Sequence, residues 1–161
     1  MNDAKLNIVL YNPEIPPNTG NIGRSCVALG AKLWLVEPLS FDIGEKAIRR
    51  SGLDYWQHLD LEVVPNWDAL LAKIGHFNPW LFTKTGNCIH TDVEYQLGDT
   101  LVFGSESSGL PNFIRDAHAN RHLRIPMSPM VRSINLATAA GIAMYEFNRQ
   151  IPLVSIWHYF W

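Results

Sequence analysis

Short apolar runs alternate with helix-like stretches along most of the chain. β-branched, aromatic and leucine residues cluster in six strand-like runs, at residues 6–11, 32–36, 61–64, 80–84, 100–104 and 122–126. Stretches with the periodicity of a helix lie between most of these runs, at about 19–29, 67–74, 111–119 and 134–149. This alternation predicts an α/β fold in which a mainly parallel sheet is flanked by helices.

Turn-forming residues concentrate directly after the predicted strands. Three segments of this kind each follow a strand-like run, namely NPEIPPNTGNIGR, TKTGN and GSESSG. A fourth, RIPMSPMVRSINL, connects the last predicted strand to the last predicted helix. Because parallel sheets bind ligands at the loops that follow the carboxyl ends of their strands, these loops are the expected site.

The segment FGSESSGLP carries two glycines with the spacing of a phosphate loop. Leu110 and Pro111 stand where such a loop needs Lys and Ser or Thr. The only charge inside the segment is Glu106, which would repel a polyphosphate. The nucleophile pattern G-x-S-x-G also fails, because Glu106 stands two residues after Gly104. The pattern therefore predicts a ligand that is neutral or cationic at its closest approach.

The first loop leads into a helix that carries an unpaired arginine. Asn18 or Thr19 is the expected N-cap of this helix. Arg24 falls nearly opposite the apolar face of the helix, which is made by Ile22, Cys26 and Leu29. Arg24 is therefore free to contact a ligand, a substrate or a second chain, although a solvated surface arginine would show the same pattern.

Composition and charge narrow the class of protein. The chain has 161 residues, 47% of them hydrophobic and 17% charged, as expected for one soluble domain over residues 1–161. A net charge of −2 argues against a general nucleic-acid binder but allows a local basic patch. The start of the chain shows neither a signal peptide nor a membrane span, so we expect a cytoplasmic protein. No metal is expected, because His118 and His122 are predicted to lie on different faces.

The last predicted helix has an unusually small surface. Its small residues allow close approach of another element, and they are Ala137, Ala139, Ala140, Gly141 and Ala143. A helix this apolar is either central to the core or packed on a partner. The aromatic ending SIWHYFW adds apolar surface that a monomer would expose, which favours a homodimer.

Taken together, the segments resemble the motifs of the SPOUT-class RNA 2′-O-methyltransferases. The match rests on PEIPPNTGNIGR, IRRSGLDYW, LVFGSESSGLP and RIPM…RSINLATAAGIAMYE, and it extends over about residues 6–149. It is most similar to the small tRNA (cytidine/uridine-2′-O)-methyltransferases that modify the wobble nucleotide 34. The resemblance implies an α/β knot with a deep C-terminal trefoil knot, a homodimer, and S-adenosyl-L-methionine bound in the knot. It further implies S-adenosyl-L-homocysteine as the product and the tRNA anticodon stem-loop as the substrate.

The resemblance also assigns roles to individual positions. It implies cofactor binding by Phe82, Thr83, Gly104, Glu106, Gly109, Ile125, Met127, Ser133 and Asn135. Phe82–Thr83–Lys84 departs from the Leu-Thr-Thr that the family pattern leads us to expect. Arg24 is implied at the reacting ribose, and Arg132 and Tyr145 are implied in substrate handling.

The family role of Arg24 as a base raises a chemical difficulty. A guanidinium is effectively always protonated in proteins. Either the site perturbs Arg24 severely, or Arg24 polarises the hydroxyl while a phosphate or a water molecule takes the proton.

Two other classes of protein remain open at this stage. One is an α/β module that binds a nucleotide or RNA without chemistry. The other is a serine hydrolase that uses Ser105, Ser107 or Ser108 with a His and an Asp on later loops.

Overall fold

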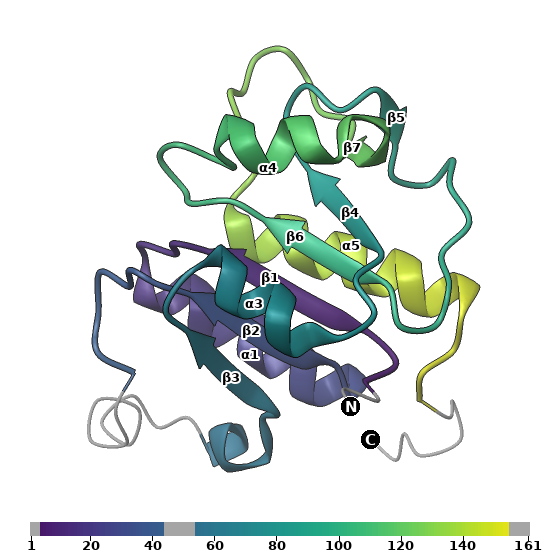
Figure 1. The fold of residues 1–161 in the computed structure, drawn as a ribbon. Coiled ribbons are helices and arrows are strands. Elements are labelled where there is room, and N and C mark those ends of the chain that lie inside the picture. Colours follow the sequence, from purple (N-terminus) through teal and green to yellow (C-terminus); the bar gives the residue numbers. More distant parts are fainter. Residues whose placement is uncertain (1–3, 44–53, 155–161) are drawn as a thin grey trace.

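The computed structural model describes residues 4–43 and 54–154, and within them the strands form a single sheet (Figure 1). The strand order is β3-β2-β1-β6-β4-β7-β5, and every neighbouring pair is parallel. The strands are β1 (Asn7–Tyr11), β2 (Lys32–Val36), β3 (Leu61–Val64), β4 (Pro79–Phe82), β5 (Cys88–Ile89), β6 (Thr100–Phe103) and β7 (His122–Arg124). The prediction of a parallel α/β sheet is confirmed.

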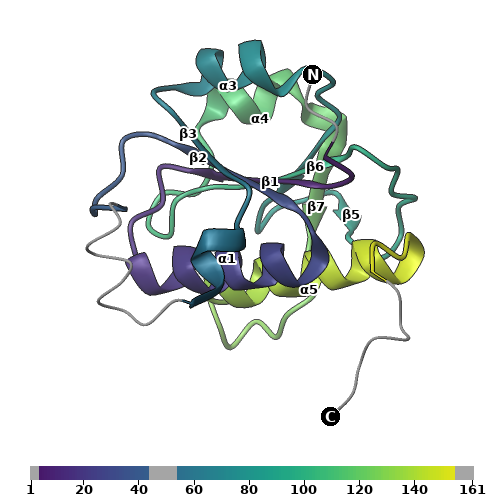
Figure 2. The ribbon, with the colours of Figure 1, turned by 90° about the horizontal axis from the view of Figure 1, so that it is seen from below.

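Helices cover both faces of this sheet. They are α1 (Pro16–Leu29), α3 (Trp67–Ile74), α4 (Asn112–Ala117) and α5 (Leu136–Gln150), with short 3-10 turns η1 (Asp54–His58) and η2 (Ala119–Arg121). Figure 2 shows α1 and α5 side by side on one face, and α3 and α4 on the other. The α/β layers are therefore those of a doubly covered sheet.

Successive strand residues point into two separate cores. In β1, Ile8 and Leu10 pack on the side of α1 and α5, whereas Val9 packs on the side of α3 and α4. β6 repeats the pattern, because Phe103 belongs to the first core and Val102 to the second. A strand buried on both faces is apolar at most of its positions, which explains the nearly continuous apolar runs in the sequence.

The start of α1 differs from the sequence-based prediction. The predicted N-cap at Asn18 or Thr19 is wrong, because the helix begins at Pro16 and its N-cap is Ile15. Proline is tolerated at the first helical positions, where the N–H that it lacks has no partner within the helix. Asn18 and Thr19 are instead buried in the first turn.

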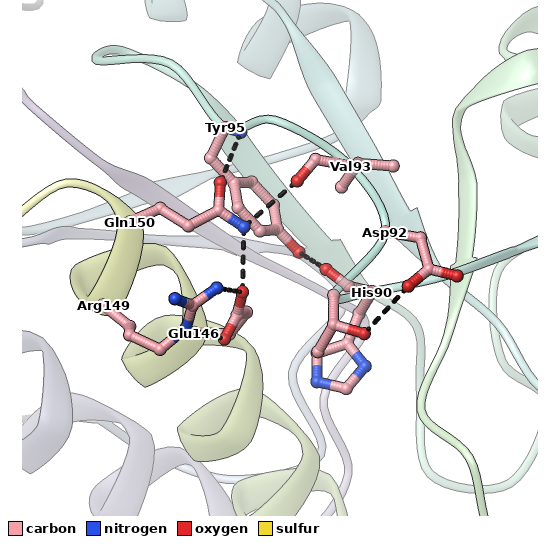
Figure 3. A network of polar contacts seen from close by, with 8 residues as sticks. His90, Asp92, Val93, Tyr95, Glu146, Arg149 and Gln150 are labelled. Carbon is pink, nitrogen blue, oxygen red and sulfur yellow. Dashed lines mark hydrogen bonds and ion pairs between the residues drawn. The ribbon is translucent and has the colours of Figure 1, made fainter.

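A polar network fixes the carboxyl end of α5 (Figure 3). The Gln150 side chain accepts a hydrogen bond from the Tyr95 N–H (3.1 Å) and donates to the Val93 carbonyl (3.1 Å) and to Glu146 (2.8 Å). The Arg149 guanidinium donates to both carboxylate oxygens of Glu146, each at 2.8 Å. The network thus binds the last helix to the connection between β5 and β6.

We predict that this network makes stability depend on pH in the acid range. The hydrogen bonds from Arg149 lower the pKa of Glu146 from 4.5 to about 2. Because the folded-state pKa is lowered, the stabilisation is complete above pH 4.5 and is lost as the pH falls towards 2. Glu146→Gln should therefore lower the Tm at pH 7, and its difference from the wild type should shrink as the pH falls below 4.5.

Thermal unfolding of both proteins between pH 7 and pH 2.5 measures this difference. Glu94→Gln is the control, since Glu94 is an exposed carboxylate in the same connection. A Glu146→Gln difference that stays constant over the whole pH range would contradict the prediction.

Candidate active site

A cavity lies where the carboxyl ends of four neighbouring strands meet. In the sheet order, β1, β6, β4 and β7 are adjacent, so the segments that follow them lie next to one another. From β1 the chain first adds β2 and β3 on one side of the sheet, and it adds β4 to β7 on the other side of β1. The strand order reverses there, and such a reversal is a topological switch point. The cavity has a volume of about 470 Å³, within the range of about 300–1,000 Å³ that is usual for small-molecule sites.

All nine residues predicted to bind a cofactor line this cavity. They come from segments far apart in the sequence, and they are Phe82, Thr83, Gly104, Glu106, Gly109, Ile125, Met127, Ser133 and Asn135. The structure therefore brings together the positions that the resemblance selected. Their role in binding stays a prediction.

One wall of the cavity is aromatic. The rings of Phe82 and Phe103 stack with centroids 4.8 Å apart and planes 19° from parallel. Ile125, Leu110 and Leu136 add aliphatic surface to the lining. Such a wall can receive the flat face of a heterocyclic base.

The two glycines of the loop after β6 are required for different reasons. A Cβ on Gly104 would lie 2.1 Å from the carbonyl carbon of Gly109, because the loop folds back on itself. The Gly109 N–H donates to the Ser105 carbonyl (2.9 Å), and Gly109 has a φ of +69° with open space beside it. Gly104 is therefore required by a close approach of backbone within the loop itself.

Glu106 joins the glycine loop to the start of α1. Its carboxylate accepts hydrogen bonds from the N–H groups of Glu14 (2.8 Å) and Ile15 (3.1 Å) and from the Asn18 amide (2.9 Å). In return, Glu14 accepts from the N–H (2.9 Å) and the hydroxyl (2.6 Å) of Ser107. Each of these two loops therefore supplies a carboxylate that accepts hydrogen bonds from the other loop. Hydrogen bonds to a charged acceptor are about twice as strong as neutral ones.

A third loop is attached to the same anchor. The Asn135 amide donates to the Asn18 side-chain oxygen at 2.9 Å. The Asn135 side-chain oxygen also caps α5 by accepting from the N–H groups of Ala137 (2.9 Å) and Thr138 (3.2 Å). Glu106, Asn18 and Asn135 thus connect the three loops that line the cavity.

The three residues predicted to be catalytic do not line the cavity. Arg24 is exposed on α1 while Ile22, Cys26 and Leu29 are buried, so the prediction of its free face is confirmed. Arg132 is exposed in the loop before α5, and Tyr145 is 52% exposed on α5 itself. Within one chain these three side chains are exposed and lie outside the cavity lining.

Tyr55 is a residue that the sequence reasoning missed. The Arg24 guanidinium lies 4.8 Å from the centre of the Tyr55 ring, and the Tyr55 hydroxyl donates to the Gly20 carbonyl (2.6 Å). Burial raises the pKa of Tyr55, so its hydroxyl remains a hydrogen-bond donor. The only signal for this residue was its place in the segment IRRSGLDYW, of which Asp54–Trp56 lie among the described residues.

None of the serines of the glycine loop has a hydrogen bond to a histidine among the described residues. Ser105 and Ser108 contact backbone groups or another serine, and Ser107 donates to the Glu14 carboxylate, which also accepts from the Ser107 N–H. A serine hydrolase with a His and an Asp beside its nucleophile is therefore not supported by this geometry. In residues 4–43 and 54–154, no three His, Cys, Asp or Glu side chains gather as a metal site. Over the same residues, no helix combines the length and apolarity needed to cross a membrane.

A ligand cavity over the carboxyl ends of a parallel sheet, with helices on both faces, is typical of the α/β enzymes that bind nucleotide-like cofactors. Comparison with known proteins gives the family. The chain belongs to the SpoU rRNA Methylase family, whose model matches residues 5–145.

Individual relatives cover nearly the whole chain. A tRNA (cytidine(34)-2′-O)-methyltransferase of Methylovorus glucosotrophus is 44% identical over 144 residues, which span 89% of this chain and 94% of the relative. A protein solved to explain the 2-OH methylation of C/U34 on tRNA is 40% identical with a TM-score of 0.84, covering 92% of this chain and 97% of that one. The methyltransferase AviRb of Streptomyces viridochromogenes, solved with the cofactor AdoMet, is 26% identical with a TM-score of 0.80 and covers 93% of this chain and 62% of its own. The fold is accordingly the SPOUT α/β knot.

We predict that the two loop glycines tolerate substitution very differently. Gly104→Ala should lower the free energy of unfolding by roughly 3 kcal/mol or more, because its Cβ meets backbone that cannot move aside. Gly109→Asn should cost roughly 1 kcal/mol or less, because asparagine accepts a positive φ and no atom lies within 4 Å of the new Cβ. Urea denaturation of the two variants compares these costs, and equal losses would refute the distinction.

Proposed function

We propose that this protein transfers a methyl group from S-adenosyl-L-methionine to the ribose 2′-hydroxyl of nucleotide 34 of tRNA, where cytidine or uridine stands. The observation that carries the proposal is the convergence of nine family-implied positions on one cavity. Relatives at 40–44% identity are named for this reaction. We propose further that the chain acts as one methyltransferase domain and works in the cytoplasm, where mature tRNA is found.

The cavity fits this cofactor by size and by chemistry. Its stacked phenylalanines suit an adenine ring, and its volume of about 470 Å³ suits a nucleoside with an amino-acid tail. Two polar atoms of cavity-lining residues, Thr83 Oγ1 and Arg115 Nε, are buried and have no hydrogen-bond partner in the described part of the chain. When bound, S-adenosyl-L-methionine supplies a methyl group activated by a cationic sulfur.

We propose that Arg24 acts on the substrate. It follows Asn18, a residue of the cavity wall, by six positions along α1, a rise of about 9 Å. The Tyr55 ring restricts the guanidinium from one side, so fewer conformations are lost when RNA binds. Since a guanidinium stays protonated, Arg24 orients and polarises the 2′-hydroxyl, and a phosphate oxygen or a water molecule takes the proton. We propose that the exposed Arg132 and Tyr145 contact the anticodon stem-loop.

We also propose a homodimer built around α5, in which each active site is completed by the arginine loop of the other chain. Among the described residues, four large apolar side chains that do not line the cavity are exposed on α5 and on the loop before it: Met130 (89%), Val131 (52%), Ile142 (37%) and Tyr145 (52%). Exposed apolar surface of this kind marks an interaction site.

Pairing two chains would also gather basic surface for a tRNA, and the sequence offers Arg24, Arg49, Arg50, Arg121 and Arg132 for this role. Arg121 is excluded, since its guanidinium lies 3.7 Å from the Trp80 ring centre and donates to the Pro79 carbonyl. Arg49, Arg50 and the ending SIWHYFW lie outside the described residues. Arg24 and Arg132 remain as the exposed cations on which the proposal rests.

Substitution of Arg24 tests the proposed chemistry. Arg24→Ala should lower methyl transfer from S-adenosyl-L-methionine to tRNA by at least roughly 100-fold, because a positioned donor is lost. Arg24→Lys should also be poor, since lysine lacks the planar fork. Both variants should still be stabilised by S-adenosyl-L-homocysteine, by about 2.7 kcal/mol at one hundred times its Kd, and ATP should give no stabilisation.

Lys73→Ala, which removes an exposed cation from α3 on the opposite face, should leave methyl transfer unchanged. Normal turnover by Arg24→Ala would remove Arg24 from the mechanism. Stabilisation by ATP without stabilisation by S-adenosyl-L-homocysteine would reverse the assignment of the cofactor.

Sedimentation tests the proposed dimer. At micromolar concentration we expect twice the chain mass of 18.2 kDa, with more than about 1,200 Å² buried in total. Ile142→Asp should weaken association, whereas Leu71→Asp on α3, which is similarly exposed at 39%, should not. A fully active species of 18.2 kDa would show that the monomer suffices.

A further inference from the structure

Three charged residues line the cavity, and two of them are cations. Lys84 follows β4 and Arg115 comes from α4, in the layer opposite α1 and α5. The third, Glu106, already accepts three hydrogen bonds from the protein. The cavity therefore presents positive charge at the end formed by β4 and α4.

The Arg115 guanidinium is only partly used by the protein. Among the described residues its one hydrogen bond runs from Nη2 to the Thr85 hydroxyl at 3.3 Å, and its buried Nε has no partner. The hydroxyl of Thr83, two residues before Thr85, is also buried without a partner. A buried donor without an acceptor is costly, so an anionic ligand group beside Arg115 would relieve both defects.

The charges of the proposed cofactor decide which of its parts belongs here. S-adenosyl-L-methionine carries a cationic sulfur, an ammonium group and one carboxylate. The two cations repel Lys84 and Arg115, and the adenine is neutral. The carboxylate is the only anionic group, and its two oxygens match the fork of a guanidinium.

We propose that Arg115, assisted by Lys84 and the Thr83 hydroxyl, binds the carboxylate of the cofactor's methionine portion. This proposal rests on the proposed function and adds residues to it. Lys84 stands where the family pattern suggests threonine, so this chain has an additional cation at that end of the cavity. With the carboxylate held at the β4–α4 end, the sulfur is directed away from the cations and towards the wall that carries Glu106 and Asn18.

A pair of ligands that differ in the amino-acid portion tests the proposal by calorimetry. S-adenosyl-L-homocysteine has the carboxylate, whereas 5′-methylthioadenosine keeps the nucleoside and the sulfur and lacks it. Arg115→Gln should weaken S-adenosyl-L-homocysteine binding by about 10- to 100-fold, because a charged hydrogen bond is lost. Lys84→Thr should weaken it by roughly 3- to 10-fold. Neither variant should change the affinity for 5′-methylthioadenosine by more than about twofold.

Lys73→Thr is the matched control, since Lys73 is an exposed lysine that does not line the cavity. Thermal unfolding without ligand shows whether each variant is folded. If Arg115→Gln is not folded, the calorimetry of Lys84→Thr, a variant at an exposed residue, tests the proposal. Equal losses for both ligands, or no loss for S-adenosyl-L-homocysteine, would overturn the carboxylate contact and leave the proposed function intact. If the wild type binds neither ligand, both proposals fail.

Discussion

The hydrogen bonds accepted by the Glu106 carboxylate are the constraint on which the site depends. They bind the loop after β6 to the first turn of α1, and Asn18 extends the connection to the cap of α5. Loops on a sheet edge are otherwise the mobile parts of a fold. The hydrogen bonds of Glu106 and of Asn18 hold three such loops together as one wall of the cavity. Each hydrogen bond to a charged group contributes about 1.5–3 kcal/mol.

This anchor also fixes Arg24 relative to the cavity of its own chain. Asn18 contacts Glu106 in the cavity wall, and Arg24 projects from the same helix about 9 Å further along. Because α1 packs its opposite face into the core through Ile22, Cys26 and Leu29, it behaves as a rigid spacer between the two. Alignment of a methyl donor with a hydroxyl depends on such fixed distances, since misplacement by about 1 Å can cost 100-fold in rate.

Much of the architecture could be predicted from the sequence because both faces of the sheet are buried. The apolar runs of β2 and β3 and the amphipathic run of α3 have the predicted bounds. The start of α1 was predicted too late in the sequence, because Asn18 is a residue type that often forms an N-cap. In the structure its side chain instead donates to Glu106 and accepts from Asn135. β5, with two residues, and η1 carry too little pattern to be recognised.

The site was predictable only in part. Periodicity located the loops, and the family resemblance selected the nine residues that line the cavity. It could not show that Glu106 is occupied by donors from α1, that Tyr55 supports Arg24, or that Arg121 is held against Trp80. Each of these contacts joins segments far apart in the sequence, and only the folded chain brings them together.

The position of the transferred methyl group tests the central claim most directly. tRNA lacking modification at nucleotide 34, incubated with this protein and S-adenosyl-L-methionine, can be digested and mapped by mass spectrometry. The account predicts one added methyl group on the ribose of nucleotide 34. A methyl group on a base, or on the ribose of any other nucleotide, would contradict it.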